Sequence, residues 1–216
     1  MKRGEATRRT AESIRNMIVE GRFADGTPLR QSKLAEELGV SRVPLREAFQ
    51  LLEAEGLVEL RSNRGAVVQL PSPDEISQLA EVRVKIECWL LQLAIPYANE
   101  SDFEALEGFQ KQMEVCTDED WSEHNIAFHD ALLAPAGRPY VIDHLHSLHQ
   151  RIFKRFHLPI ISVRDREKMT REHWEILDLY RNRELDAAAS RLESHILISA
   201  QPAIDRVRAV YGRRPV

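Results

Sequence analysis

Three histidines and one asparagine stand at spacings that packing alone does not explain. Asn125 and His129 are four residues apart, so in a helix both side chains lie on one face. His173 and His195 follow in two further segments of helical period, so three helices could bring the four side chains to one centre. Neutral imidazoles with an oxygen donor suit zinc, nickel or cobalt, and suit magnesium or calcium poorly. The spacing therefore indicates a divalent metal site, with ordinary hydrogen-bonded histidines as the alternative.

The other five histidines, His124, His144, His146, His149 and His157, show no comparable pattern. His146 and His149 are i, i+3 neighbours beside the basic residues Arg151, Lys154 and Arg155. The apolar positions of the same helix are Ile142, Leu145, Leu148 and Ile152. We therefore expect His146 and His149 to lie on a solvated or dimer-facing surface.

A second set of residues suits DNA recognition. The stretch from Ser32 to Leu52 has a helix-turn-helix layout, with a short helix capped by Ser32, a tight turn at Gly39 and a longer helix capped by Ser41. On the longer helix Arg42, Arg46 and Gln50 fall at i, i+4 and i+8, apart from an apolar stripe of Leu45, Ala48, Phe49 and Leu52. Arginine forks bind phosphate oxygens or the edge of guanine. The alternative is an ordinary solvated helix face.

These residues require two units that position them. The first, residues 1–70, reads as three helices followed by a small β-hairpin made of Leu57–Leu60 and Val67–Leu70. Two prolines mark a linker at 71–76, where Asp74 can cap the next helix, and residues 77–216 are helical in period throughout. We expect helices near 74–98, 102–116, 119–133, 138–157, 165–181 and 184–210. The fold class is mainly α, a winged helix-turn-helix followed by an antiparallel all-helical bundle.

Composition excludes several other classes. With 43% hydrophobic and 30% charged residues, the 216-residue chain has the composition of a globular protein. No apolar run approaches the roughly 20 residues that span a bilayer, and the charged first twenty residues do not form a signal peptide. Two cysteines, Cys88 and Cys116, give no disulfide framework, so we expect a cytoplasmic protein with no membrane association. Residues 1–70 hold twelve Lys and Arg against ten Asp and Glu, whereas the remainder is acidic, in keeping with a DNA-binding first unit.

The stretch LAEELGVSRVPLREAFQLLEAEGLVELRSNRGAVV closely resembles the winged-helix domain of the GntR family of bacterial transcription regulators. The resemblance implies that Arg42, Arg46 and the wing-tip Gly65 contact operator DNA. Many members carry an arginine where this chain has Ser32, and Arg30 or Lys33 could supply that contact. We therefore expect a DNA-binding set of Lys33, Ser41, Arg42, Arg46, Gln50, Arg64 and Gly65.

The second unit looks like the FCD domain of the FadR subfamily. The segments that carry the likeness are Glu81 to Glu87, Asn125 to His129, Glu172-His173, and Ala187 to His195. In many members a divalent metal is bound by four residues: an acid or amide, the histidine of a Phe-His pair, and two later histidines. The resemblance thus implies that His129, His173, His195 and Asn125 bind one, zinc first, with nickel or manganese as alternatives. Aspartate is frequent where Asn125 stands, so this position is expected to be a weaker ligand.

Arg83 has two interpretations. It can form a salt bridge with Glu87 four residues later, which contributes little to stability at a surface. It can instead bind an effector carboxylate, because guanidinium matches that anion with two parallel hydrogen bonds. The family resemblance favours the second interpretation.

The leading hypothesis is a metabolite-responsive transcription regulator, most often a repressor in this subfamily. It would bind palindromic double-stranded operator DNA as a homodimer and respond to a small organic acid. One alternative is a metal-dependent hydrolase or isomerase, because three protein ligands leave open positions on the metal. Glu172 is the one suitably placed general base for such an enzyme, and the enzyme alternative would leave the helix-turn-helix unexplained. A third alternative is a purely structural metal in a dimerisation domain.

Overall fold

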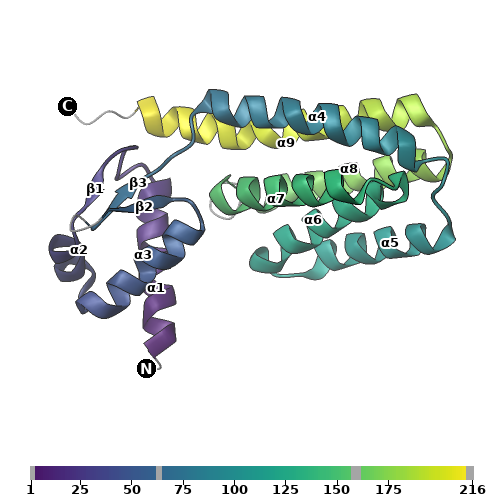
Figure 1. The fold of residues 1–216 in the computed structure, drawn as a ribbon. Helices are drawn as coiled ribbons and strands as arrows, with labels where there is room; N and C mark the ends of the chain where they lie inside the picture. Colours follow the sequence, from purple (N-terminus) through teal and green to yellow (C-terminus); the bar gives the residue numbers. More distant parts are fainter. Residues whose placement is uncertain (1–2, 62–64, 157–161, 213–216) are drawn as a thin grey trace.

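The computed structural model describes residues 3–61, 65–156 and 162–212. Its chain forms a small N-terminal unit of helices and short strands, followed by a larger helical unit (Figure 1). A hydrophobic cluster fills each unit. The expected fold class, mainly α with a winged helix-turn-helix ahead of a helical bundle, is confirmed.

The N-terminal unit contains three helices and a three-stranded antiparallel sheet. The helices are α1 (Arg3–Val19), α2 (Gln31–Leu38) and α3 (Arg42–Ala54), and the strands are β1 (Pro28–Leu29), β2 (Val58–Arg61) and β3 (Gly65–Val68). Strand β3 lies in the middle, pairing with β2 through Val58↔Val68 and with β1 through Pro28↔Val67. The expectation of a two-stranded hairpin was therefore incomplete. A two-residue strand that contains proline carries no alternating pattern by which the sequence could reveal it.

Most helix ends of the larger unit were placed by sequence to within one or two residues, but its first helix ends at Ala94, four residues before the expected position 98. Gly39 ends α2 in the left-handed conformation, as a turn glycine should. Arg30, and not Ser32, occupies the N-cap position of α2, and Ser41 occupies that of α3. Ser72, and not Asp74, caps the first helix of the larger unit, accepting a hydrogen bond from the backbone N–H of Glu75. Several polar residues in a row can each serve as a cap, so composition alone does not choose among them.

Gly65 is the wing residue whose lack of a side chain the fold requires. Its φ is +81°, and a Cβ atom placed there would lie 2.6 Å from the backbone oxygen of Leu29. The close approach of β1 to β3 therefore depends on this glycine. Arg64, the other predicted wing contact, lies outside the described residues.

The larger unit is an antiparallel bundle. Its helices are α4 (Pro73–Ala94), α5 (Glu100–Val115), α6 (Asp118–Leu133), α7 (Pro139–Phe156), α8 (Val163–Arg181) and α9 (Leu185–Gly212), with a short 3-10 turn at Ala134–Ala136. Asn99 and Ser162 open α5 and α8 with reciprocal capping boxes. Helix α4 begins at Pro73, within the expected linker 71–76.

Helices α4 and α9 run side by side along one face of the bundle, and α5 lies on the opposite face beneath α6 and α8 (Figure 1). The core between them includes Leu90, Phe128, Ile176, Tyr180 and Leu192, all fully buried. Helices α4, α6, α8 and α9 all contribute to this core, so polar residues on their inward faces necessarily meet. Among the described residues, none of the helices has both the length and the apolar character needed to cross a bilayer.

Candidate functional site

Three of the four predicted metal ligands come together in the middle of the bundle. His129 on α6, His173 on α8 and His195 on α9 are each at most 2% exposed. One ring nitrogen from each can be chosen so that all three lie within 4.8 Å of one another. The Nε2 atoms of His173 and His195 are 3.0 Å apart. Residues separated by up to 66 positions in the sequence thus share one centre.

The tautomer of His173 is fixed by Gln110 on α5. The side-chain amide of Gln110 donates through Nε2 to the backbone oxygen of Thr170 at 2.9 Å. A carbonyl oxygen only accepts, so this bond orients the amide and turns its own oxygen toward His173, 3.1 Å from Nδ1. His173 must therefore carry its proton on Nδ1, which leaves the lone pair of Nε2 facing the centre. Phe128 stacks on the His173 ring, with centroids 4.5 Å apart, and holds its plane.

His195 is oriented in the same way by a carboxylate. Its Nδ1 donates to Glu172 Oε2 at 2.8 Å, and the other oxygen of Glu172 lies 3.4 Å from Arg191. Burial alone would raise the pKa of Glu172, but the hydrogen bond from His195 and the charge of Arg191 lower it below its ordinary value. The carboxylate is therefore ionised and held by its neighbours. This engagement argues against Glu172 as the general base that the enzyme alternative needs.

His129 completes the pattern. Its Nδ1 lies 3.0 Å from Oε2 of Glu87, a fully buried carboxylate on α4. Each of the three imidazoles thus has an oxygen atom beside Nδ1, and Nε2 of His173 and of His195 faces the centre. Histidines that bind metals in proteins almost always donate their second ring nitrogen to such an oxygen.

Burial keeps the three imidazoles neutral. Desolvation lowers the pKa of His129 and, together with the neighbouring His195 and His129, lowers that of His173 well below its usual value. Desolvation also lowers the pKa of His195 to about 4, against the opposing effect of Glu172. The neutral imidazole is the form that binds a metal.

The residues fit a divalent metal of the zinc or nickel class. Two acceptor nitrogens, one on His173 and one on His195, face each other at 3.0 Å, and each Nδ1 proton is already committed elsewhere. A cation between them would replace the repulsion of two lone pairs by two coordinate bonds. Asn125 lies one helical turn before His129 on α6 and is 2% exposed, so it is within the same buried layer. Its carbonyl oxygen would be the neutral fourth donor.

Arg83 is buried, contrary to the idea of a surface salt bridge. Its Nε donates to Glu87 Oε1 at 2.6 Å, and the two side chains are 6% and 0% exposed. His149 joins them, with Nε2 2.8 Å from the same Glu87 oxygen and 3.0 Å from Arg83 Nε. Burial would raise the pKa of Glu87, but Arg83, then His149 and His129, hold it well below its ordinary range. Glu87 therefore links Arg83 to the histidine cluster.

The prediction for His149 was wrong, because this residue is 0% exposed and belongs to the buried network. His146 is half-exposed and pairs with Asp130. Sequence reasoning also missed Gln110 and the central place of Glu87. The signal was present in each case: a polar residue interrupts an apolar stripe at helical spacing. The stripes are Phe103, Leu106, Gln110 and Met113 on α5, Ala80, Val84, Glu87 and Leu91 on α4, and Leu145, His149 and Ile152 on α7.

The predicted DNA-reading residues share an exposed face of α3. Ser41, Arg42, Arg46 and Gln50 are all exposed, and the opposite face of the helix is buried through Leu45, Ala48, Phe49 and Leu52. Lys33 on α2 is also exposed. An uncovered helix face with two arginines near the helix start has the form that enters a major groove.

Comparisons with known proteins agree with both units. A sequence model of the FCD domain matches residues 78–197, more than half of the chain, and one described as bacterial regulatory proteins of the gntR family matches residues 6–68. The HTH-type transcriptional repressor RspR of Escherichia coli K12 is 27% identical over 187 residues, which cover 85% of this chain and 82% of the repressor. The galactonate operon transcriptional repressor of the same strain is 27% identical over 209 residues, covering 84% and 90%.

A crystal structure of a GntR-family transcriptional regulator from Pseudomonas syringae pv. tomato DC3000 is also similar. It superposes with a TM-score of 0.55 at 28% identity, covering 97% of this chain and 90% of that one. The matched families and relatives are DNA-binding regulators and not enzymes.

Proposed function

Because the chain belongs to the GntR family of bacterial regulatory proteins and carries an FCD domain, we propose that it is a metal-dependent, metabolite-responsive repressor of transcription. It acts where the chromosome lies, in the cytoplasm. The winged unit, residues 1–70, reads operator DNA. The bundle, residues 77–216, receives the effector and transmits its presence.

One observation carries the metal part of the proposal. Three buried histidines from three helices each have an oxygen beside Nδ1, from Glu87, Gln110 and Glu172. His129, His173 and His195 would hold a divalent ion, with Asn125 as a weaker fourth ligand. When bound, the ion supplies a Lewis-acidic positive centre that attracts an anion. Zinc is the first candidate, and nickel and manganese are the others.

The effector is proposed to be a small organic acid. A neutral Asn125 leaves the full charge of the divalent ion uncompensated by its ligands, which favours an anionic partner. Arg83 is the second candidate contact, although its Nε is already held by Glu87, so an effector carboxylate would compete with or join that ion pair. A relative named for the galactonate operon makes hydroxy acids of that kind the first to test.

The chain is proposed to act as a homodimer on a palindromic site. Large apolar side chains are exposed on the adjacent helices α4 and α9, with Val82 45%, Trp89 45%, Leu197 43% and Ile198 40% exposed. A second copy of the chain could cover these exposed apolar side chains, and a two-fold dimer presents its recognition helices to successive major grooves.

Three measurements on the full chain test the proposal. Elemental analysis should find about one divalent ion per chain in the parent protein and little in the His129→Ala, His173→Ala double variant. Selection from random duplexes should yield a palindrome, and a hydroxy acid should raise the melting temperature of the metal-loaded protein and weaken its DNA binding. Stoichiometric metal in the double variant would place the metal elsewhere.

A further inference from the structure

A cavity of about 300 Å³ lies between helices α5, α6 and α8, apart from the histidine cluster. Its lining residues are Met113, Glu114, Cys116, Trp121, Val163, Arg166, Glu167, Thr170, Arg171 and Trp174. None of the proposed metal ligands is among them, and neither is Arg83. The volume is at the lower end of the range that proteins use for small organic ligands.

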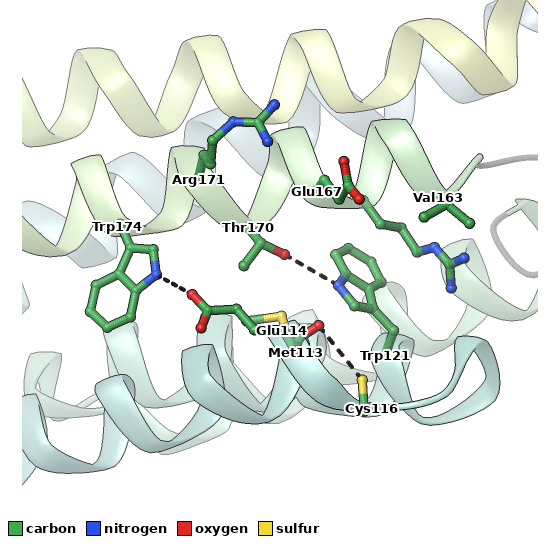
Figure 2. A pocket seen from close by; sticks show the side chains of 10 residues that line it. Met113, Glu114, Cys116, Trp121, Val163, Glu167, Thr170, Arg171 and Trp174 are labelled. Atoms are coloured by element: carbon green, nitrogen blue, oxygen red, sulfur yellow. Dashed lines mark hydrogen bonds between the residues drawn. The ribbon is translucent and has the colours of Figure 1, made fainter.

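The floor of this cavity is apolar and aromatic. Trp121 and Met113 are 4% and 5% exposed, and Trp174 is half-buried. Figure 2 shows the two indoles at opposite ends, with Thr170 and Glu114 between them. Trp121 donates to Thr170 Oγ1 at 3.4 Å, and Trp174 donates to Glu114 Oε1 at 2.8 Å. Both rings are therefore held in place and present rigid flat surfaces, which bind other aromatic rings by stacking.

The charged lining is balanced. Two arginines, Arg166 and Arg171, are matched by two glutamates, Glu114 and Glu167. The Arg171 guanidinium is also directed away from the two indoles (Figure 2). A lining without net charge gives an anion no advantage and makes the desolvation of any charged ligand costly. The Glu114 carboxylate has a second oxygen beside Trp174, and a carboxylate accepts more than one hydrogen bond.

We propose that this cavity is a second small-molecule site that binds a neutral aromatic molecule with an N–H donor, of the indole class. The ring would lie against Trp121 or Trp174 on the Met113 floor, and the N–H would donate to Glu114. This ligand class differs from the anion proposed for the histidine site, so the two sites are distinguishable by the charge of the ligand.

The test uses 5-fluoroindole and the full-length protein in the presence of a chelator. Its ¹⁹F signal should broaden and shift in a saturable way. The Trp174→Leu variant should bind about three- to tenfold more weakly, the range that one aromatic pair contributes. The matched control is Tyr97→Leu, which removes an exposed aromatic side chain between α4 and α5, outside the cavity, and should bind like the parent.

A second variant, Glu114→Ala, changes an exposed side chain and removes both the proposed acceptor and the partner of the Trp174 N–H, so it also should bind more weakly. No saturable binding to the parent, or equal binding by all four proteins, would overturn the site. Tighter binding of phenylacetate than of 5-fluoroindole would overturn the neutral class of ligand. Because metal and DNA are absent, either failure leaves the proposed regulatory function untouched.

Discussion

The Nε2 atoms of His173 and His195 face each other at 3.0 Å, although Nδ1 of each ring is already committed to an oxygen acceptor. Because burial lowers the pKa of both rings, they are neutral, and a neutral ring cannot supply a proton to the gap without giving up its bond to Gln110 or Glu172. The fold therefore holds two lone pairs together in a buried site. Such an arrangement is costly without a cation and favourable with one.

Gln110 should act as a positioning residue for the metal. In Gln110→Ala, His173 loses the acceptor that fixes its tautomer, so we expect metal affinity to fall by about 10- to 100-fold. The measurement is competition against a chromophoric chelator. Gln112→Ala, on the same helix but exposed, is the matched control and should keep the parent affinity. Equal affinities in both variants would mean that Gln110 serves packing only.

Asn125→Asp should tighten metal binding and weaken the effector response. A carboxylate adds a charged oxygen ligand and lowers the formal charge of the site from +2 to +1, so an anionic effector gains less from approaching it. Chelator competition measures the first effect, and effector titration of the DNA complex measures the second. If the metal affinity does not change, Asn125 is not a ligand. If the variant binds both the metal and the effector more tightly than the parent, the charge argument is contradicted.

The exposed face of α3 should carry sequence-specific DNA binding. Replacing Arg46 by Ala should cost about 1–3 kcal/mol on the selected operator if the side chain reads a base, and should weaken all duplexes alike if it holds phosphate. The same applies to Arg42→Ala. Mobility-shift titrations should include Arg9→Ala, which removes an exposed arginine on α1 outside the predicted DNA-binding set. Parent-like binding by both α3 variants would refute the assignment of this face.

The buried ion pair on α4 yields a prediction about stability. Glu87→Gln keeps the shape of the side chain but leaves Arg83 in the core without its anion, which should cost about 3–5 kcal/mol. Denaturant unfolding of metal-free protein measures the loss independently of the metal. Glu81→Gln, exposed on the same helix, should cost less than about 0.5 kcal/mol. A small loss for Glu87→Gln would show that Arg83 reaches solvent or another partner.

Helical period predicted the bundle and allowed His129, His173 and His195 to converge, because amphipathic helices hide one face. The resemblance to the FCD domain was needed to single out these three histidines among the eight. The same period could have revealed Gln110, Glu87 and His149, each of which interrupts an apolar stripe. The sequence could not show which hydrogen-bond acceptor lies beside which histidine. Which acceptor faces which Nδ1 depends on how α4, α5 and α8 pack, and the basic neighbours of His149 suggested a surface. Likewise the short strand β1 forms because it pairs with the edge of β3, and the sequence of β1 alone does not show this pairing.

The aromatic cavity and the histidine cluster share one structural element, which leads to a prediction of coupling that rests on both proposals. The side-chain oxygen of Thr170 accepts a hydrogen bond from the Trp121 N–H, and its backbone oxygen accepts one from the Gln110 amide. The oxygen of Gln110 in turn accepts a hydrogen bond from His173 Nδ1. A ligand that shifts Trp121 should therefore alter metal affinity, and thermodynamic linkage requires the metal to alter 5-fluoroindole affinity by the same factor. We expect a coupling of about fivefold or more.

Chelator competition with and without saturating 5-fluoroindole, and ¹⁹F titrations with and without zinc, should give equal factors for this coupling. Gln110→Ala should abolish the coupling while leaving 5-fluoroindole binding to the metal-free protein intact. Two unequal factors would point to zinc binding outside the cluster, and a factor of one in both experiments would show that the two sites are independent.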